Sequence, residues 1–454
     1  MTMRAICLNF QIHQPFRFRR YRFFDIGNDH YYYDDYANET SIRGAVEKCY
    51  MPANELLLRL IGKYGSRFKV SFSISGIAMD QFRLYAPEIL DSFRNLAATG
   101  NVEFLSETYS NSLASLKSKS LFEAQVRKHD EVITSSFGMK PSVFRNSELI
   151  YSDQIGEWVA AMGFGGILSD GPRPVLGWKS PNYLYCNALN PRLKVLMRNF
   201  QLSDDLSFRF GNREWNEYPL SAEKFVRWMN DNLKDELVNL FLDYQILGII
   251  QPKESGIFEF FEKLPEAVIK ATDYVFATPS EVVDRLQPVA RINVPHPISW
   301  ADEERDLTAW LGNEMQQEAF HKLYEFDQRM RLVTDDELQK DWAYLQACDH
   351  LRYMSTKFFS GGQISHYENP YENPYEAFIN FMNVLSDFEL RLNSMVPKDK
   401  TEQEIASLTH LLQEKERRIE KYETELKALQ QRRKRRKANV SKRKSAIAKS
   451  SHKE

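Results

Sequence analysis

Short apolar segments alternate with amphipathic segments about seven times between residues 4 and 286. The apolar segments are rich in β-branched and aromatic residues and end at Gly, Pro or polar positions, as strands do. We predict strands at 4–10, 68–74, 101–105, 142–144, 166–168, 194–199, 237–243 and 274–276, with helices between most of them. Strands separated by helices pair in parallel, so the sequence predicts an α/β fold with a parallel sheet, most simply closed into a barrel.

The pattern changes after about residue 300. Longer helical segments are predicted at 304–331, 335–358 and 374–396. We therefore expect a barrel domain over 1–300 and a helical domain over 301–398 that completes the site.

The C-terminal region has two further patterns. Apolar residues at heptad positions, with Lys415 as the polar exception, predict a short coiled-coil helix within 399–431; they are Ile405, Leu408, Leu412, Ile419, Tyr422, Leu426 and Leu429. Residues 432–454 contain eleven Lys or Arg and one acid, which predicts a disordered basic tail. The helix suggests a homo-oligomer. The tail is either solvated or in contact with a polyanion.

Composition limits the class of protein. With 43% hydrophobic residues and a net charge of −2 over 454 residues, the balance is that of a globular protein. Four cysteines without paired spacing indicate reduced thiols and a cytoplasmic location. The N-terminal apolar run is too short for a signal peptide, and no stretch approaches a membrane span. Nine scattered histidines show no ligand spacing, so neither a metal nor another cofactor is expected.

Polar residues follow several predicted strands. His13, Glu103, Glu148 and Asp243 all lie at or just beyond strand ends, where barrels place their chemistry. A pair of carboxylates suffices for glycoside hydrolysis, because one attacks the anomeric carbon and the other protonates the leaving oxygen and then activates water. The residues that precede Glu148 leave an alternative open, in which it is a surface acid paired with Arg145.

Five stretches resemble glycoside hydrolase family 57, whose members act on α-glucans such as starch and glycogen. They are Ile12-His13-Gln14-Pro15, residues 100–109 (GNVEFLSETY), residues 144–151 (FRNSELIY), residues 240–244 (LFLDY) and residues 300–313, which include Trp300, Asp306 and Trp310. The third and fifth stretches are long and specific.

The resemblance implies the roles of these residues. It makes Glu148 the nucleophile and Asp243 the general acid/base of a retaining mechanism, on an incomplete (β/α)7 barrel with a C-terminal helical domain and no required metal. The substrate-binding candidates are His13, Glu103, Glu107, Arg145, Trp300, Asp306 and Trp310. Simpler interpretations remain: His13 as a buried histidine bonded to a carbonyl, one of the two glutamates as a partner of Arg145, and both tryptophans as core.

Two departures from the family pattern remove titratable groups beside the site. After Asp243-Tyr244 the family usually has Glu-Thr-Phe-Gly and then Glu-His, whereas this chain has residues 245–250, QILGII. In the second stretch the family often has Tyr-Tyr-His-Ser, whereas this chain has residues 109–112, YSNS. Either change can alter the pKa of Asp243 or weaken sugar contacts.

Three hypotheses follow. The first is a retaining α-glucan hydrolase or transferase, including 4-α-glucanotransferase or branching activity, whose partner is an α-glucan or maltooligosaccharide. The second is a glucan-binding homologue with reduced or lost turnover, favoured by Gln245-Ile246-Leu247. The third is a barrel carbohydrate deacetylase, which needs a metal and lacks a visible set of one Asp and two His ligands.

Overall fold

The computed structural model describes residues 3–231, 235–357 and 369–396, together with Leu408, Leu412 and Lys415. It divides into two compact units, Met1–Asp327 with Asp336–Phe388 and Gln328–Asp335 with Glu389–Glu454. Every site residue discussed below belongs to the first unit. Apart from those three positions, the predicted coiled coil and basic tail lie outside the described residues.

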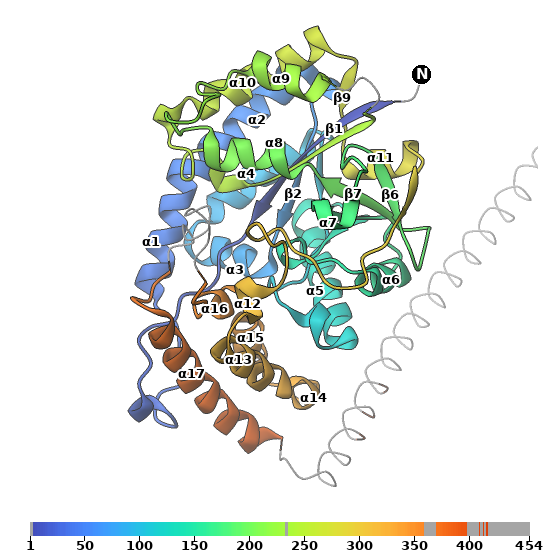
Figure 1. The fold of residues 1–454 in the computed structure, drawn as a ribbon. Helices are drawn as coiled ribbons and strands as arrows, with labels where there is room; N and C mark the ends of the chain where they lie inside the picture. Colours follow the sequence, from blue (N-terminus) through green and yellow to red (C-terminus); the bar gives the residue numbers. More distant parts are fainter. Residues whose placement is uncertain are drawn as a thin grey trace, which may run out of the picture. The chain divides into compact units, whose positions relative to one another are not determined.

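All eight predicted strands form (Figure 1). They are β1 (Arg4–Ile12), β2 (Val70–Ile74), β3 (Val102–Phe104), β4 (Val143–Arg145), β5 (Gly166–Asp170), β7 (Lys194–Arg198), β8 (Leu237–Asp243) and β9 (Tyr274–Phe276). Two further strands, β6 (Leu184–Asn187) and β10 (Ala290–Ile292), were not predicted. β6 precedes β7 with no helix between them and pairs with it antiparallel, so it falls outside the strand–helix alternation used for the prediction.

The strands form two sheets, and the first sheet contacts the second at both of its edge strands, β3 and β8. One sheet has the order β3-β2-β1-β8, with β9 beside the start of β1, and the other has the order β10-β6-β7-β5-β4. All pairings are parallel except that of β6 with β7. Ser106 bridges to Phe144 between the sheets, and Asn199 N donates to Asn239 O at 2.8 Å on the other side. The mixed α/β class and the parallel sheets predicted from the sequence are confirmed.

Helices occupy the connections between the strands (Figure 1). They are α1 (Asp35–Ala45), α2 (Met51–Tyr64), α3 (Gly76–Tyr85), α4 (Pro87–Ala98), α5 (Lys119–Phe137), α6 (Asp153–Ala161), α7 (Arg173–Leu176), α8 (Phe200–Asp204), α9 (Ala222–Asn230), α10 (Ile257–Ala271) and α11 (Pro279–Arg285). Local signals fix their ends: Ser118 caps α5 by accepting from Leu121 N, and Gly138 ends it at φ 71°. In the described part of the chain, no helix has both the length and the apolarity to cross a membrane.

The two faces of β1 pack differently. Ile6, Leu8, Phe10 and Ile12 join a large apolar cluster with side chains of the surrounding helices, and Ala5 and Cys7 begin a smaller one. At the alternate positions further along the strand the residues are polar, and Asn9 Nδ2 donates to Asn239 Oδ1 at 2.7 Å. The face of β1 that begins with Ala5 and Cys7 therefore changes from apolar to polar toward the carboxyl end of the strand, while the other face stays apolar.

Of the three long helices predicted after residue 300, the one at 374–396 is confirmed by α17 (Pro374–Met395), and the two at 304–331 and 335–358 are wrong because each is interrupted. In their place the structure has α12 (Thr308–Leu311), α13 (Glu314–Glu325), α14 (Asp327–Met330), α15 (Asp336–Leu345) and α16 (Asp349–Arg352). Asn313 interrupts the first segment because its side chain accepts from Gln316 N at 2.9 Å and caps α13. The second is interrupted because Ala347 forms an antiparallel bridge with Ser112.

Candidate active site

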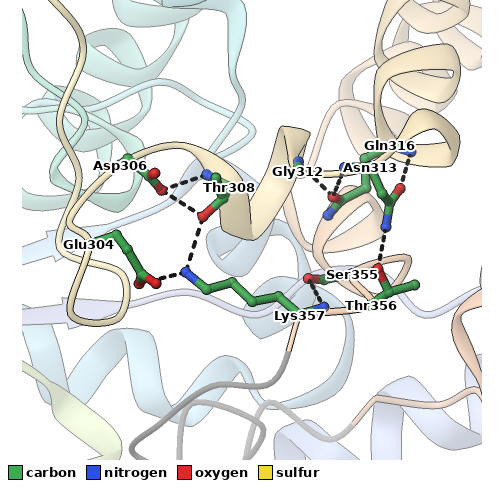
Figure 2. A pocket seen from close by; sticks show the side chains of 9 residues that line it. All are labelled: Glu304, Asp306, Thr308, Gly312, Asn313, Gln316, Ser355, Thr356 and Lys357. Atoms are coloured by element: carbon green, nitrogen blue, oxygen red, sulfur yellow. Dashed lines mark hydrogen bonds and ion pairs between the residues drawn. The ribbon is translucent and has the colours of Figure 1, made fainter.

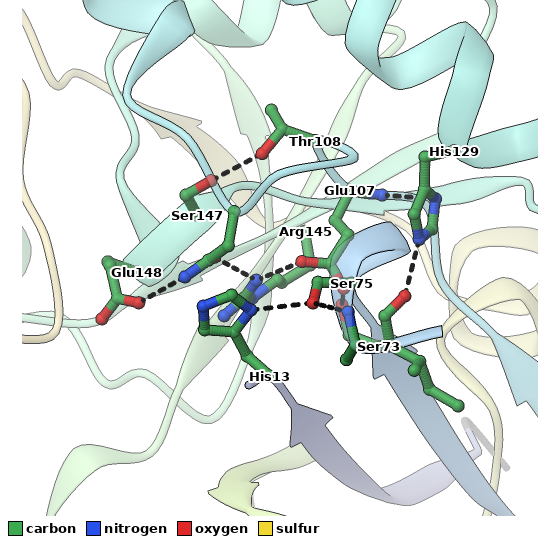
Figure 3. A network of polar contacts seen from close by, with 12 residues as sticks. His13, Ser73, Ser75, Glu107, Thr108, His129, Arg145, Ser147 and Glu148 are labelled. Atoms are coloured by element: carbon green, nitrogen blue, oxygen red, sulfur yellow. Dashed lines mark hydrogen bonds and ion pairs between the residues drawn. The ribbon is translucent and has the colours of Figure 1, made fainter. Parts of the chain in front are cut away.

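His13 follows β1, and its ring lies between the side chains of Ser75 and Asp349; Figure 3 shows the contact with Ser75. Its Nδ1 lies 2.7 Å from Ser75 Oγ and its Nε2 lies 2.7 Å from Asp349 Oδ2. Burial disfavours the charged imidazole, but the carboxylate of Asp349 outweighs burial and raises the pKa of His13. The pKa of Asp349 is lowered, because the interaction with His13 likewise exceeds the cost of burial. His13 therefore contacts a hydroxyl and a carboxylate, and the alternative in which it bonds to a carbonyl is wrong.

Glu107 and Arg145 form a fully buried ion pair (Figure 3). Arg145 Nη1 lies 2.8 Å from Glu107 Oε2, and Ser73 Oγ donates to Glu107 Oε1 at 3.0 Å. Arg145 Nη1 also donates to Asn111 Oδ1 at 3.2 Å. The partner of Arg145 is thus Glu107, as one alternative held, and the interpretation of Glu148 as a surface acid paired with Arg145 is wrong.

Glu148 follows β4 in a left-handed conformation, with φ 54° and ψ 28°. Such a conformation costs a non-glycine residue about 1–2 kcal/mol and is found most often where a side chain has a function. The carboxylate is 3% exposed. Its Oε1 accepts from Asn111 Nδ2 at 3.0 Å and its Oε2 from Trp300 Nε1 at 2.8 Å. Cys348 Sγ lies 3.7 Å from Oε1. Each oxygen of this buried acid therefore has a donor that fixes its orientation.

Trp300 is held on both its backbone and its ring. Its backbone N donates to Glu148 O at 3.2 Å, so the two residues are bonded twice. The centroids of the Trp300 and Phe241 rings lie 5.4 Å apart with an interplanar angle of 71°, and the Arg198 guanidinium lies 5.4 Å from the centroid of the Trp300 ring. The indole therefore presents its N–H to the carboxylate from a fixed position.

A cluster of charged side chains that was not predicted from the sequence lies beside Trp300. It consists of Asp170, Arg198, Asp204 and Arg305. Arg198 Nη2 lies 2.6 Å from Asp204 Oδ1 and Nη1 lies 3.4 Å from Asp170 Oδ1. Arg305 Nη2 lies 2.9 Å from Asp204 Oδ2, and its Nη1 donates to Trp300 O at 2.5 Å. Burial raises the pKa of Asp170 despite both arginines, whereas in Asp204 they overcome burial and lower the pKa. The positions of Asp170 and Arg198 at strand ends were the signal available in the sequence.

Asp243 ends β8, opposite Gln11 in the register of β1. Its Oδ1 accepts from Gln245 N at 2.8 Å, which caps the following turn. Ile246 and Leu247, the residues that depart from the family pattern, are fully buried. Asp243 and Glu148 thus follow two strands of the same ring that are separated by β5 and β7. Their action as a catalytic pair stays a prediction.

The remaining candidates lie outside the hydrogen-bond network of His13, Glu107 and Glu148. Glu103 accepts from Ser280 N at 3.0 Å at the start of α11, and burial raises its pKa to about 7. Trp310 is 1% exposed within α12, which favours core packing over sugar stacking. Sugar contacts by these two residues stay predictions.

Asp306 lines a polar pocket of about 280 Å³ (Figure 2). Its Oδ1 accepts from Thr308 N and Thr308 Oγ1 at 2.8 and 2.6 Å. Lys357 Nζ lies 2.7 Å from Glu304 Oε2 and donates to Thr308 Oγ1 at 3.1 Å. Such a lining suits a ligand rich in hydroxyl groups. Among the described residues, no group of three or more His, Cys, Asp or Glu is arranged to hold a metal.

Known proteins are similar to this chain in sequence or in fold. The family model described as "Glycosyl hydrolase family 57" matches residues 7–295. A Methanocaldococcus jannaschii protein named "Putative alpha-amylase" is 38% identical over 408 residues, covering 87% of this chain and 86% of its own length.

Two solved structures share the fold at 14% identity. The family 57 branching enzyme from Thermococcus kodakaraensis superimposes with a TM-score of 0.63 over 89% of this chain and 94% of its own. The 4-alpha-glucanotransferase from Thermococcus litoralis superimposes with a TM-score of 0.58, and the match covers 84% of this chain and 60% of that enzyme.

Proposed function

Because this chain belongs to glycosyl hydrolase family 57, we propose that it is a retaining hydrolase or transferase of α-glucans with Glu148 as nucleophile and Asp243 as general acid/base. One observation carries the proposal. Glu148 is buried in a left-handed turn at the end of β4, and its two oxygens accept from Asn111 and Trp300. An acid held in this way has the fixed orientation that attack on carbon requires.

The proposed reaction has two steps. Glu148 attacks the anomeric carbon while the glycosidic bond breaks, and Asp243 gives its proton to the leaving oxygen. In the second step Asp243 takes a proton from an acceptor hydroxyl, whose oxygen attacks the anomeric carbon and releases Glu148. Water as acceptor gives hydrolysis, and a sugar hydroxyl gives 4-α-glucanotransferase or branching activity.

The substrate-binding residues are proposed from their positions. His13, Glu107 and Arg145 are polar or charged groups near Glu148. His13 contacts Asp349, and Glu107 pairs with Arg145. Asp306 lines the polar pocket in the segment that follows Trp300, which supports a site for sugar hydroxyls outside the reaction centre. An incomplete (β/α)7 barrel agrees with the seven strands that form the ring.

A glucan-binding protein without turnover is the second candidate. It is favoured by the segment after Asp243, where Ile246 and Leu247 are buried and offer no hydrogen bond through their side chains. In this reading Asp243 serves the turn it caps, through its contact with Gln245 N.

Product analysis separates the two candidates. Purified protein is incubated with soluble starch and with maltooligosaccharides, and any change in product length is measured. Glu148→Gln should abolish turnover while leaving the fold intact, and a mechanism-based fluorosugar should label Glu148 alone. Activity within about tenfold of wild type would remove the nucleophilic role, since losing a nucleophile costs several kcal/mol of barrier. Binding without turnover in the wild type would favour the second candidate.

The role of Asp243 needs its own variant. Asp243→Asn should slow substrates with poor leaving groups far more than activated aryl glycosides, because only the former need a proton on the departing oxygen. Equal losses on both substrates would assign Asp243 to binding or to the structure of its turn.

The domain limits and the C-terminal assignments are also proposals. The barrel and helical domains are proposed over 1–300 and 301–398, the coiled coil over 399–431 as the contact of a homo-oligomer, and the basic tail over 432–454 as a polyanion contact. The heptad pattern supports the coiled coil, and the eleven basic residues support the polyanion contact of the tail. Deleting 400–454 should reduce the number of chains per particle measured by light scattering, or weaken salt-sensitive polyanion binding, without changing turnover.

A further inference from the structure

Asn111 lies between the buried ion pair and the proposed nucleophile. Its Oδ1 accepts from Arg145 Nη1 at 3.2 Å, and its Nδ2 donates to Glu148 Oε1 at 3.0 Å. The same Nδ2 donates to Cys348 Sγ at 3.4 Å, so the whole amide is used. Asn111 is fully buried, which makes each of these bonds costly to lose.

The orientation of this amide is set by chemistry. A guanidinium has only donors, so the atom of Asn111 that faces Arg145 has to be the oxygen. The nitrogen then has to face Glu148, and a flipped amide would place a donor against a donor and an acceptor against an acceptor. Arg145 therefore determines that Glu148 meets a donor.

The backbone of Asn111 is fixed as well. Its φ is 49°, a region that Asn enters more readily than most residues. Cys348 N donates to Asn111 O at 3.2 Å, and Ser112 bridges to Ala347. Two residues earlier, the Tyr109 ring lies over Gly76, where a Cβ would stand 2.2 Å from the ring. The loop that carries the amide is therefore held from both sides.

We propose that Asn111 is a positioning residue that links Arg145 to Glu148 and holds the Glu148 carboxylate in its attacking orientation with a donor that does not titrate. The inference rests on the proposed nucleophilic role of Glu148. An amide keeps its N–H at every pH, whereas an imidazole, which the family often has here, loses or gains a proton near neutrality.

Charged and titratable groups approach Glu148 from several elements. Arg145 of β4 reaches it through Asn111, and the Cys348 thiol lies 3.7 Å from Oε1. His13, paired with Asp349, and Glu107 complete the set, since His13 interacts electrostatically with both glutamates. All of these groups keep their own chemistry in a variant confined to the amide, so a changed pH profile reports the contacts of residue 111 with Glu148, Arg145 and Cys348.

Two variants separate the contacts of this amide. Asn111→Asp has the same shape and keeps an oxygen toward Arg145, but it places a carboxylate oxygen against Glu148. The two carboxylates then repel each other, so the pair becomes doubly ionised only at higher pH. Asn111→Gly removes the side chain without strain, because glycine adopts a φ of 49° freely.

The test measures pH–activity profiles and kinetics on an activated aryl α-maltooligosaccharide. For Asn111→Asp we expect the acid limb to move up by about one pH unit or more. For Asn111→Gly we expect kcat to fall by about 10- to 100-fold with little change in KM. The control is Asn187→Asp, since Asn187 is also a buried amide with two donated bonds but lies outside the site. It should lower stability and leave the profile in place.

Two results overturn the inference in different ways. If Glu148→Gln is inactive, while Asn111→Asp keeps the wild-type profile and Asn111→Gly keeps kcat within about threefold, the positioning role is refuted and the proposed function stands. If Glu148→Gln keeps wild-type activity, the proposed function itself fails, and the inference fails with it. Should Asn111→Asp not fold, the kcat and KM of Asn111→Gly decide alone.

Discussion

The hydrogen bond from Trp300 to Glu148 is suited to a quantitative test, because one atom of the indole makes it. Trp300→Phe removes Nε1, which donates to Glu148 Oε2 at 2.8 Å, and keeps an aromatic ring against Phe241 and Arg198. A hydrogen bond to a charged group contributes about 1.5–3 kcal/mol. If the bond persists in the transition state, its loss should lower kcat/KM by about 10- to 150-fold, since about 1.4 kcal/mol corresponds to tenfold.

The same segment offers a matched control. Trp310 is also a tryptophan, is 1% exposed, and its Nε1 has no hydrogen-bond partner among the described residues. Trp310→Phe therefore loses packing but no hydrogen bond to an acid. If Trp310 is core, as its burial favours, the variant should lower the free energy of unfolding and leave kcat/KM within about threefold; a rise in KM alone would instead support the predicted sugar contact. Steady-state kinetics and urea unfolding of both variants are the assay. Equal kinetic losses in the two would refute the assignment of the Trp300 effect to its N–H.

Two further predictions concern the buried charges. Glu107→Gln leaves Arg145 buried without its counter-charge, so the free energy of unfolding measured in urea should fall by about 3–5 kcal/mol, and a change below about 1 kcal/mol would contradict the buried pair. Because the pKa of His13 is raised, its contribution to folding stability is complete below its unfolded pKa of about 6.5 and is lost as the pH rises through the folded pKa. Because the pKa of Asp349 is lowered, its contribution is complete above its unfolded pKa of about 3.9 and is lost as the pH falls through the folded pKa. The stability advantage of wild type over His13→Asn should thus be greatest between about pH 4 and 6.5 and shrink in alkaline urea titrations; an advantage that grows above pH 7 would reverse the assigned sign.

Much of the β/α region was predictable because its signals are local. An apolar run such as 237–243 needs no knowledge of its neighbours to be recognised as a strand, and the structure has β8 over the same residues. The end of each strand also fixes where its next polar side chain lies, which is why His13 and Glu148 were found as candidates. Their partners were not predictable in the same way. Arg145 had acidic residues near it in sequence, and only the strand order β3-β4 selects Glu107.

The two failures after residue 300 arise where specific hydrogen bonds override helical periodicity: Asn313 caps α13 within the first segment, and a tertiary bridge interrupts the second. Residues 335–358 have a helical pattern, yet Ala347 leaves the helix to bridge Ser112, and Cys348 N donates to Asn111 O. A continuous helix through this point would withdraw both backbone contacts. The interruption has a consequence for the site, since it places Asp349 within 2.7 Å of His13 and Cys348 within 3.7 Å of Glu148. The local helical pattern thus fails at the residues whose side chains contact His13 and Glu148, which follow distant strands.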